Sequence, residues 1–304
     1  MISRRFGIEI EICSFDGKKR TPPKELPKGI DYVAFKLSKF LQKRVEICDC
    51  KENHDNTTWI VKIDNSCGME ISPPILKGGI GLKTVYDLVC FLKQDPNITS
   101  NTNCAFHVHV NINDLNKEQI GSVVAHWIKC EPVILDSMPF NRKMNRYCQM
   151  IGMLDFLKSD FNMSASSLIK LIGEYKYYSL NAYHYYNMKR RTLEFRTMGH
   201  QACIDPNLAI DWIRFVLHFV EITSKLPIPQ PYDFKDHKTG LCWLDPKEVI
   251  ELLNLDKYLR DWFISNMYFN SNCYKGINSG FWSKSSRVVA LEQINDLYKS
   301  IYNK

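Results

Sequence analysis

Three short segments of the chain carry ionisable side chains at every second residue, a spacing typical of β-strands. The alternating groups are Glu9 and Glu11, His107 and His109, and Glu194 and Arg196. Side chains two residues apart project from the same face of a strand. Carboxylates and imidazoles bind divalent metal ions, and a guanidinium binds phosphate or carboxylate oxygens. If the three strands are neighbours, their polar faces converge on a site for metal and anion chemistry.

Each pair also has an ordinary structural explanation. An E-x-E face is commonly solvated, an H-x-H pair can be structural, and an E-x-R pair can be a surface ion pair. The intervening residues are apolar in all three segments, such as Ile8 and Ile10 in the first and Val108 in the second. This alternation predicts one sheet with a hydrophobic core behind it and a charged face in front.

A fourth segment, VKIDNSCGMEISPPIL at 61–76, places two acidic residues around a turn. Asp64 and Glu70 flank a Ser-Cys-Gly sequence, and the two prolines that follow interrupt regular strand pairing. The two acids are either exposed beside this turn or supply two more oxygen ligands near the end of the sheet. Both interpretations are open.

Hydrophobic periodicity predicts the elements that position these groups. Strands are expected at 5–13, 104–111 and 193–196, with a hairpin formed by 44–48 and 57–64. Helices are expected from Asp31, from 82 to 93, around Ile120 to Ile128, and from Asp205-Pro206. Strands with one polar face indicate mostly antiparallel pairing, so the predicted fold class is α+β or mixed α/β.

A proline-rich stretch, LPIPQPYDFKD at 226–236, predicts a break in the domain organisation. Its prolines exclude a helix and favour an extended chain. We therefore expect a main domain at 1–225, a linker at 226–240 and a small helical addition at 241–304. Three helices are predicted in that addition, in DPKEVIELL, LDKYLRDWFISNMYF and SRVVALEQINDLYKSIY.

The composition is that of a globular protein with a large core: 304 residues, of which 45% are hydrophobic and 24% charged. A net charge of +7 without a run of like charges suits a small anionic substrate, and it does not establish nucleic-acid binding. No apolar run approaches the ~18 residues of a membrane span. Glu9 and Glu11 stand where a signal peptide would be apolar.

The cysteines predict a reducing, cytoplasmic setting. There are 11, an odd number, scattered through the chain without a C-x-x-C motif. A zinc site built from Cys48, Cys50 and His54 is the alternative, but it lacks a fourth ligand and the spacing of the usual zinc fingers. Reduced, partly buried thiols are the expectation.

Six segments, taken in order, resemble the amidoligase branch of the carboxylate–amine ligases, distant relatives of glutamine synthetase and glutamate–cysteine ligase. They are FGIEIE (6–11), GMEISPPIL (68–76), CAFHVHVN (104–111), FNRKMNRYC (140–148), YYSLNAY (177–183) and RTLEFRTMG (191–199). Together they span most of residues 1 to 225. One departure is Ala105, where the family often has glycine in C-G-x-H-V-H, although both histidines are in place.

The resemblance implies a glutamine-synthetase-like domain, a curved and mostly antiparallel sheet with helices packed on one face. It also implies ATP-dependent amide formation through an acyl phosphate, with Mg²⁺ or Mn²⁺ neutralising the phosphates. The implied metal ligands are Glu9, Glu11, Glu70, His107, Glu194 and, more weakly, Asp64. His109 and Asn181 would contact the nucleotide.

The resemblance also implies arginines that bind the reacting anions. Arg142 and Arg146 are four residues apart, so on a helix both guanidinium groups would lie on one face. A solvated basic helix face is the alternative for this pair. Arg196, on the Glu194 side of its strand, would contact the substrate carboxylate or a phosphate.

Two other functions can use the same features. A metal-dependent hydrolase or nuclease would need the acidic cluster but no ATP. A non-enzymatic nucleic-acid-binding module would use the basic and aromatic C-terminal part, namely Trp262, Phe263, Tyr268, Phe269, Tyr274, Lys275, Phe281, Trp282, Lys284 and Arg287. A ligase would take a carboxylate and an amine from an amino acid, peptide, protein side chain or modified base. A homo-oligomer is compatible with the resemblance.

Overall fold

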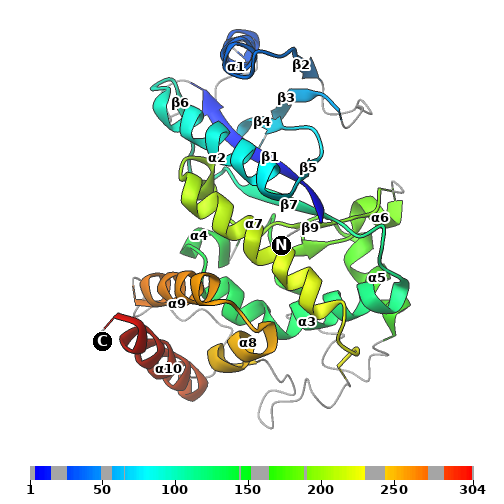
Figure 1. The fold of residues 1–304 in the computed structure, drawn as a ribbon, viewed down its shortest axis with the longest axis vertical. Coiled ribbons are helices and arrows are strands. Elements are labelled where there is room, and N and C mark those ends of the chain that lie inside the picture. Colours follow the sequence, from blue (N-terminus) through cyan, green and yellow to red (C-terminus); the bar gives the residue numbers. More distant parts are fainter. Residues whose placement is uncertain are drawn as a thin grey trace. The chain divides into compact units, whose positions relative to one another are not determined.

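The computed structural model describes residues 4–14, 26–48, 57–64, 66–143, 145–151, 164–187, 190–229, 244–272 and 284–302. Figure 1 gives the labels of the helices and strands. The chain forms two compact units, each described by itself. Unit 1 comprises residues 1–111 and 194–216, and unit 2 comprises residues 112–193 and 217–304.

Unit 1 is built on an open, mostly antiparallel sheet, as the α+β prediction requires. The strands follow the order β2-β3-β4-β1-β7-β9, and β5 and β6 also pair with β1. Their bounds are β1 (Arg5–Ser14), β2 (Val45–Cys48), β3 (Trp59–Asp64), β4 (Gly68–Ser72), β5 (Leu76–Lys77), β6 (Ile98–Thr99), β7 (Phe106–Asn111) and β9 (Thr192–Phe195). The long β1 lies between β4 and β7 and organises the sheet.

The predicted hairpin of 44–48 and 57–64 is wrong, because β2 and β3 run parallel. Val45 pairs with Trp59, and Cys48 pairs with Lys62. A tight hairpin needs only two to five loop residues, whereas the longer connection here lets the chain return and run in the same direction. The hairpin partner of β3 is β4, across the Ser-Cys-Gly turn, where Asp64 pairs with Gly68.

The sheet of unit 1 has an apolar face that forms the core. Phe6, Ile8, Ile10 and Ile12 are all buried, and α1 (Leu26–Leu41) and α2 (Gly78–Gln94) contact the strands (Figure 1). Gly81 allows α2 to approach closely, since a Cβ there would lie 3.0 Å from the Leu76 side chain and 3.3 Å from the Phe6 ring.

The helices of unit 1 follow the predicted periodicity, but α1 and α2 both begin earlier than predicted, α2 at Gly78 rather than at Leu82. α2 buries Val85, Leu88, Val89 and Leu92, as the sequence predicted. α1 begins at Leu26 rather than at Asp31. Its second residue is proline, which the first turn of a helix accommodates because no amide hydrogen is needed there.

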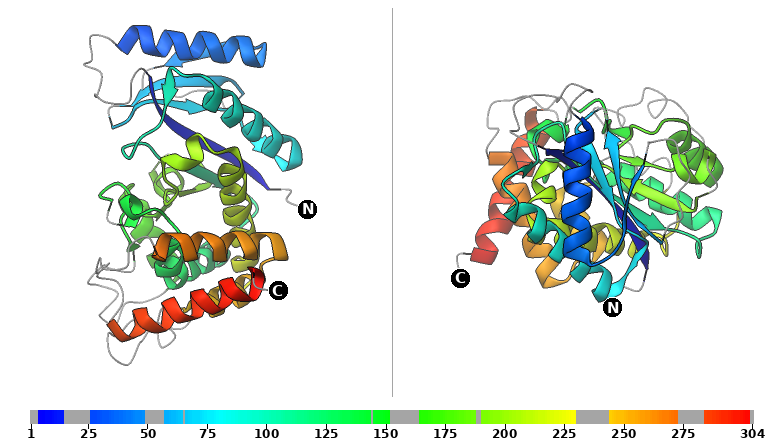
Figure 2. Two further views of the ribbon diagram at one scale, coloured as in Figure 1. Left: turned by 90° about the vertical axis from the view of Figure 1, so that its left-hand side faces the viewer. Right: turned by 90° about the horizontal axis from the view of Figure 1, so that it is seen from above.

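Unit 2 is mainly helical (Figure 2). Its elements are α3 (Lys117–Asp136), α4 (Phe140–Lys143), α5 (Ala165–Glu174), β8 (Leu180–Asn181), α6 (Tyr183–Asn187), α8 (Pro246–Leu253), α9 (Lys257–Asn272) and α10 (Lys284–Tyr302). The 3₁₀-helix η3 (His200–Cys203) belongs to unit 1, and α7 (Pro206–Thr223) runs from unit 1 into unit 2.

The three predicted C-terminal helices are present in unit 2, where α8 and α9 pack on α3 and α10 packs on α9 and α8. The Leu244 amide donates to the Lys129 carbonyl at 3.2 Å, and Asn270 Nδ2 donates to the Ser137 carbonyl at 2.8 Å. Tyr268 of α9 stacks on Tyr298 of α10 with ring centroids 3.8 Å apart. These contacts assign part of the aromatic C-terminal region to helix packing.

Some predicted features lie outside the described residues. Residues 230–240 of the expected linker are among them, so the boundary at 226–240 stays a prediction. The aromatic and basic residues Tyr274, Lys275, Phe281 and Trp282 are also outside.

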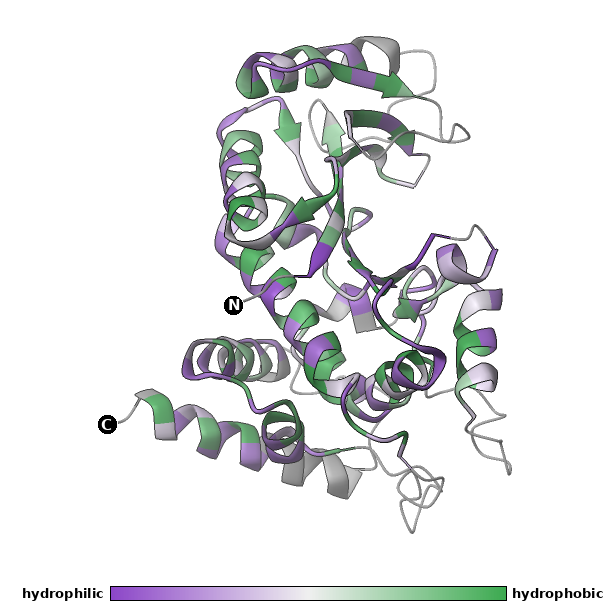
Figure 3. Ribbon diagram, turned by 45° about the vertical axis from the view of Figure 1, so that its right-hand side comes forward, coloured by the Kyte–Doolittle hydropathy of each residue, from purple (hydrophilic) through white to green (hydrophobic). Residues whose placement is uncertain are grey.

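Within the described part of the chain, no helix combines the length and apolar character needed to cross a bilayer. Figure 3 agrees with this finding, since α9 and α10 carry hydrophilic and hydrophobic stretches side by side.

Candidate metal centre

Strand register brings the predicted polar residues of unit 1 onto one face of the sheet. Glu9 of β1 pairs with His107 of β7, and Glu11 pairs with Glu70 of β4. Residues directly opposite each other in a sheet share a face, with Cβ atoms ~5 Å apart. Because the neighbouring residues Ile8, Ile10 and Ile12 fill the core, the acids must point the other way.

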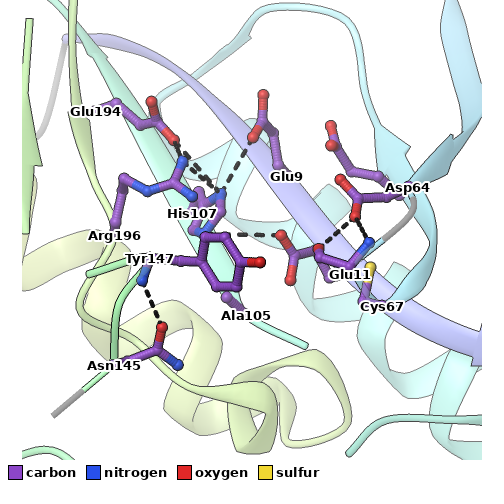
Figure 4. Close-up of polar contacts among 12 residues, drawn as sticks. Glu9, Glu11, Asp64, Cys67, Ala105, His107, Asn145, Tyr147, Glu194 and Arg196 are labelled. Atoms are coloured by element: carbon purple, nitrogen blue, oxygen red, sulfur yellow. Dashed lines mark hydrogen bonds and ion pairs between the residues drawn. The ribbon is translucent and has the colours of Figure 1, made fainter. Parts of the chain in front are cut away.

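His107 stands at the centre of this group (Figure 4). Its Nδ1 lies 3.2 Å from Glu9 Oε2 and 3.4 Å from Glu194 Oε1, and its Nε2 lies 3.9 Å from Glu11 Oε1. Arg196 contacts the Glu194 carboxylate and approaches His107 Nδ1 at 3.5 Å. Glu9, His107 and Glu194 offer ligand atoms within 4.8 Å of one another, a suitable spacing for one metal ion.

His109 lies beside the same carboxylate. Its Nε2 is 3.1 Å from Glu9 Oε1, so Glu9 lies between the two histidines of the H-x-H segment. Burial lowers the pKa of His109, but the Glu9 and Glu194 carboxylates outweigh burial and raise that pKa overall. The imidazole therefore keeps its proton to higher pH than an isolated histidine.

Lys62 is a member of this face that the sequence interpretation missed. Its Nζ lies 2.7 Å from Glu70 Oε1 and 3.9 Å from Glu9 Oε1. The sequence contains the pattern that predicts this position, because Lys62 stands two residues before Asp64 in a strand and therefore shares its face. It supplies positive charge between two carboxylates that would otherwise repel each other.

Asp64 lies where the turn between β3 and β4 begins. Its Oδ1 accepts a hydrogen bond from the Ser66 amide at 2.7 Å, and Gly68 ends the turn with a φ of 123°, a value that favours glycine. Asp64, Glu11 and Cys67 form a second group of ligand atoms within 4.8 Å of one another. The turn thus brings Asp64 to the Glu11 end of the face.

The environment separates the protonation states of these groups. Burial and the charge of Arg196 lower the pKa of His107 to about 4. Burial and the Glu9 carboxylate raise the pKa of Glu70 to about 7, although Lys62 opposes this. For Glu194, burial raises the pKa, but Arg196, His109 and His107 together outweigh burial and lower the pKa to about 2. For Glu9, burial again raises the pKa, but His109, Lys62 and His107 together hold it well below the usual value. At neutral pH the face therefore holds the carboxylates of Glu9 and Glu194 and a neutral His107, which are good metal ligands, while Glu70 is close to the midpoint of its titration.

The donor set fits a hard divalent cation. His107 Nε2 is buried and has no hydrogen-bond partner among the described residues. Among the described residues, the acids Glu9, Glu11, Asp64, Glu70 and Glu194 outnumber Lys62, which contacts Glu9 and Glu70, and Arg196, which contacts Glu194. Oxygen ligands with one imidazole are compatible with Mg²⁺ or Mn²⁺.

The other predicted site residues lie in unit 2. α4 ends at Lys143, so the expectation that Arg142 and Arg146 share one helix face is wrong. Arg142 is buried, whereas Arg146 is exposed and donates to Tyr147 Oη at 2.7 Å. A single helical turn before Asn145 and Tyr147 leaves the two guanidinium groups in different settings.

Asn181 is fully buried in unit 2 and holds a local turn. Its Nδ2 donates to the Lys176 carbonyl at 2.9 Å, and its Oδ1 accepts from the Tyr183 amide at 3.1 Å at the start of α6. These bonds fix the chain between β8 and α6.

Comparison with known proteins gives one family match. The profile of the family described as "Putative amidoligase enzyme" matches residues 3–220. No curated protein matches the chain. Among solved structures, a bifunctional glutathione synthetase from Pasteurella multocida is similar at 8% identity and a TM-score of 0.43. That alignment covers 99% of this chain and 52% of the other, so the chain spans about half the length of that protein.

Proposed function

Because the chain belongs to this amidoligase family, we propose that it is an ATP-dependent carboxylate–amine ligase that activates its carboxylate as an acyl phosphate. The observation that carries the proposal is the cluster of Glu9, His107 and Glu194, with contacts of 3.2 and 3.4 Å, on one face of the sheet. We propose further that this sheet is of the glutamine-synthetase type and that its polar face is the catalytic floor.

The residues of the cluster have distinct proposed roles. Glu9, Glu11, Glu70, Glu194 and His107 hold Mg²⁺ or Mn²⁺, with Asp64 as a further ligand. A divalent cation supplies charge neutralisation for the phosphates and polarises the phosphoryl group to be transferred. His107 binds through a neutral nitrogen, because its lowered pKa keeps it unprotonated at neutral pH.

Positive groups on the same face bind the anions. Arg196 presents a guanidinium fork to the substrate carboxylate or to the phosphoryl oxygens. His109, whose pKa is raised, donates a proton in a hydrogen bond to a nucleotide phosphate. Lys62 compensates Glu9 and Glu70 while no substrate is bound.

The residues of unit 2 complete the proposal. Arg142 and Arg146 bind the developing acyl phosphate, and Asn181 orients the nucleotide through the turn that it fixes. The substrates are a carboxylate and an amine, each from an amino acid, a peptide, a protein side chain or a modified base.

An acyl-hydroxamate assay tests the proposal. The protein is incubated with ATP, Mg²⁺ and hydroxylamine over a panel of amino acids and peptides, since hydroxylamine traps an acyl phosphate whatever the natural amine. We expect ADP and hydroxamate in equal amounts, dependent on one carboxylate. Glu194→Gln should abolish both products, whereas Glu174→Gln, at an exposed carboxylate of α5, should not. Phosphodiester or ester cleavage without ATP consumption would instead support a metal-dependent hydrolase and overturn the ligase assignment.

A further inference from the structure

Two thiols of unit 1 lie in contact at the Glu11 end of the polar face. Cys13 stands near the end of β1, and Cys104 lies just before β7. Their sulfur atoms are 3.5 Å apart and hydrogen-bonded. The backbones that carry them are neighbours as well, because the Glu11 amide donates to the Ala105 carbonyl at 3.1 Å. The sheet therefore holds together two thiols that are 91 residues apart in the sequence.

These are not the cysteines that the sequence suggested as a zinc site. Cys48 is buried at the end of β2, and Cys50 and His54 lie outside the described residues. Cys13 and Cys104 are both free thiols, as the sequence predicted for the cysteines. Cys13 is partly exposed, whereas Cys104 is fully buried. A small oxidant in solvent can therefore reach the pair from the Cys13 side.

We propose that Cys13 and Cys104 form an oxidation site, at which a peroxide joins the two sulfur atoms in a disulfide. A disulfide bond is ~2.05 Å long, so the two sulfur atoms must approach each other by about 1.5 Å from their separation of 3.5 Å. Rotation about the side-chain bonds can supply this approach, because the backbones are already hydrogen-bonded neighbours. The reduced pair is thus arranged for disulfide formation.

The reaction balances with one molecule of hydrogen peroxide. One sulfur, as its thiolate, attacks the O–O bond, takes one oxygen as a sulfenic acid and releases the other as water. The second sulfur then attacks the sulfenic sulfur, forms the S–S bond and releases the oxygen as a second water. The two thiols together lose two electrons and two protons, and the peroxide is reduced to two waters. A dithiol reductant reverses the step by thiol–disulfide exchange.

The disulfide changes the turn before β4, because the Cys13 thiol also holds that turn. In the reduced protein Cys13 Sγ donates to the Cys67 carbonyl at 3.2 Å. A disulfide sulfur carries no proton, so oxidation removes this hydrogen bond. Asp64 begins the same turn and accepts from the Ser66 amide at 2.7 Å. Oxidation therefore loosens the segment that places Asp64 at the polar face.

The pair adjoins the proposed metal ligands without being one of them. Cys13 follows Glu11 by two residues in β1, so the two side chains share a face of the strand. Cys104 precedes His107 by three residues. Disulfide formation needs neither a metal ion nor ATP, and the inference does not depend on the ligase activity.

Peptide mapping after treatment with hydrogen peroxide tests the site. Full-length reduced protein is oxidised, the remaining thiols are alkylated, and tryptic peptides are analysed by mass spectrometry. Cleavage after lysine and arginine puts Cys13, Cys67 and Cys104 in three separate peptides, so the linked pair is identified directly. We expect a disulfide between the peptides of Cys13 and Cys104, and its loss on treatment with dithiothreitol.

Hydrogen–deuterium exchange measures the effect on the turn. In the wild type, the peptide that contains Cys67 should exchange about fivefold faster after oxidation, the factor that corresponds to one neutral hydrogen bond. Cys13→Ala should show the same faster exchange without oxidant, because it also lacks the thiol donor. Cys104→Ser should keep the slow exchange when treated with peroxide, and Cys130→Ala, at a buried cysteine of α3 in unit 2, should respond like the wild type. Circular dichroism checks the folding of each variant.

Several results would overturn the proposal, and each can be obtained with the wild type alone. They are thiols of Cys13 and Cys104 that both remain alkylatable after peroxide treatment, a disulfide that links Cys104 to Cys67 instead, or exchange in the turn that is the same in the reduced and the oxidised protein.

Discussion

The substitution Glu70→Gln tests how much free energy the folded protein loses when the buried Glu70 carboxyl ionises on the acidic face. The Glu70 side chain is only 6% exposed, contacts Lys62 at 2.7 Å and accepts a hydrogen bond from Ser72 Oγ at 2.9 Å. Burial and the Glu9 carboxylate nevertheless raise its pKa from the usual 4.5 to about 7. Glutamine keeps the shape and the hydrogen-bonding capacity of the side chain but cannot ionise.

The sign and size of the effect follow from proton linkage. Between pH 4.5 and 7 the folded protein binds more protons at Glu70 than the unfolded chain does, so this group's contribution to stability is lost as pH rises. Integrating between a pKa of 4.5 and a pKa of about 7 gives a loss of about 2.5 kcal/mol from pH 5 to pH 8. The glutamine variant does not have this loss.

Urea denaturation of the metal-free protein in EDTA measures this pH-dependent loss of unfolding free energy. The difference in unfolding free energy between Glu70→Gln and wild type should grow by about 2.5 kcal/mol from pH 5 to pH 8, in favour of the variant. Glu174→Gln, at a side chain that is 57% exposed, is the matched control and should show no such change. A difference that stays constant, or that falls with pH, would mean that Lys62 fully compensates an ionised Glu70 and would refute the reasoning.

Three further predictions concern other residues of the proposed centre. Lys62→Met should destabilise the metal-free protein by about 3 kcal/mol at pH 8, because Glu9 and Glu70 are left without their shared cation, and Mg²⁺ should restore most of the loss in urea denaturation. Arg146→Lys should lower kcat by roughly 10²–10³ in the hydroxamate assay with an unchanged Tm, since the side chain is exposed and a lysine cannot make bidentate contacts; near-normal kcat would remove Arg146 from the site. His107→Asn should remove a rise in stability of about 3 kcal/mol between pH 4 and pH 6.5, since the folded imidazole stays neutral to a pKa of about 4 while the unfolded one is protonated; an unchanged pH profile of urea denaturation would contradict this.

Local pattern determined much of the fold and of the candidate centre. Alternation in β1 and β7 assigned Ile8 and Val108 to the core and Glu9 and His107 to the other face, because strand side chains alternate strictly. The helical period predicted the buried positions of α2, because residues three or four apart lie on the same face of a helix. These features depend on neighbours within a few residues, which the sequence contains directly.

Tertiary structure decided which strands are neighbours and which groups meet. Nothing local distinguishes the parallel pairing of β2 with β3 from a hairpin, because the choice depends on where the connecting chain can run. The contacts of Lys62 with Glu70 and of Cys13 with Cys104 join residues far apart along the chain or on facing strands, so register alone creates them. The pKa of Glu70 differs from that of an exposed glutamate for the same reason, since burial and nearby charge are properties of the assembled sheet.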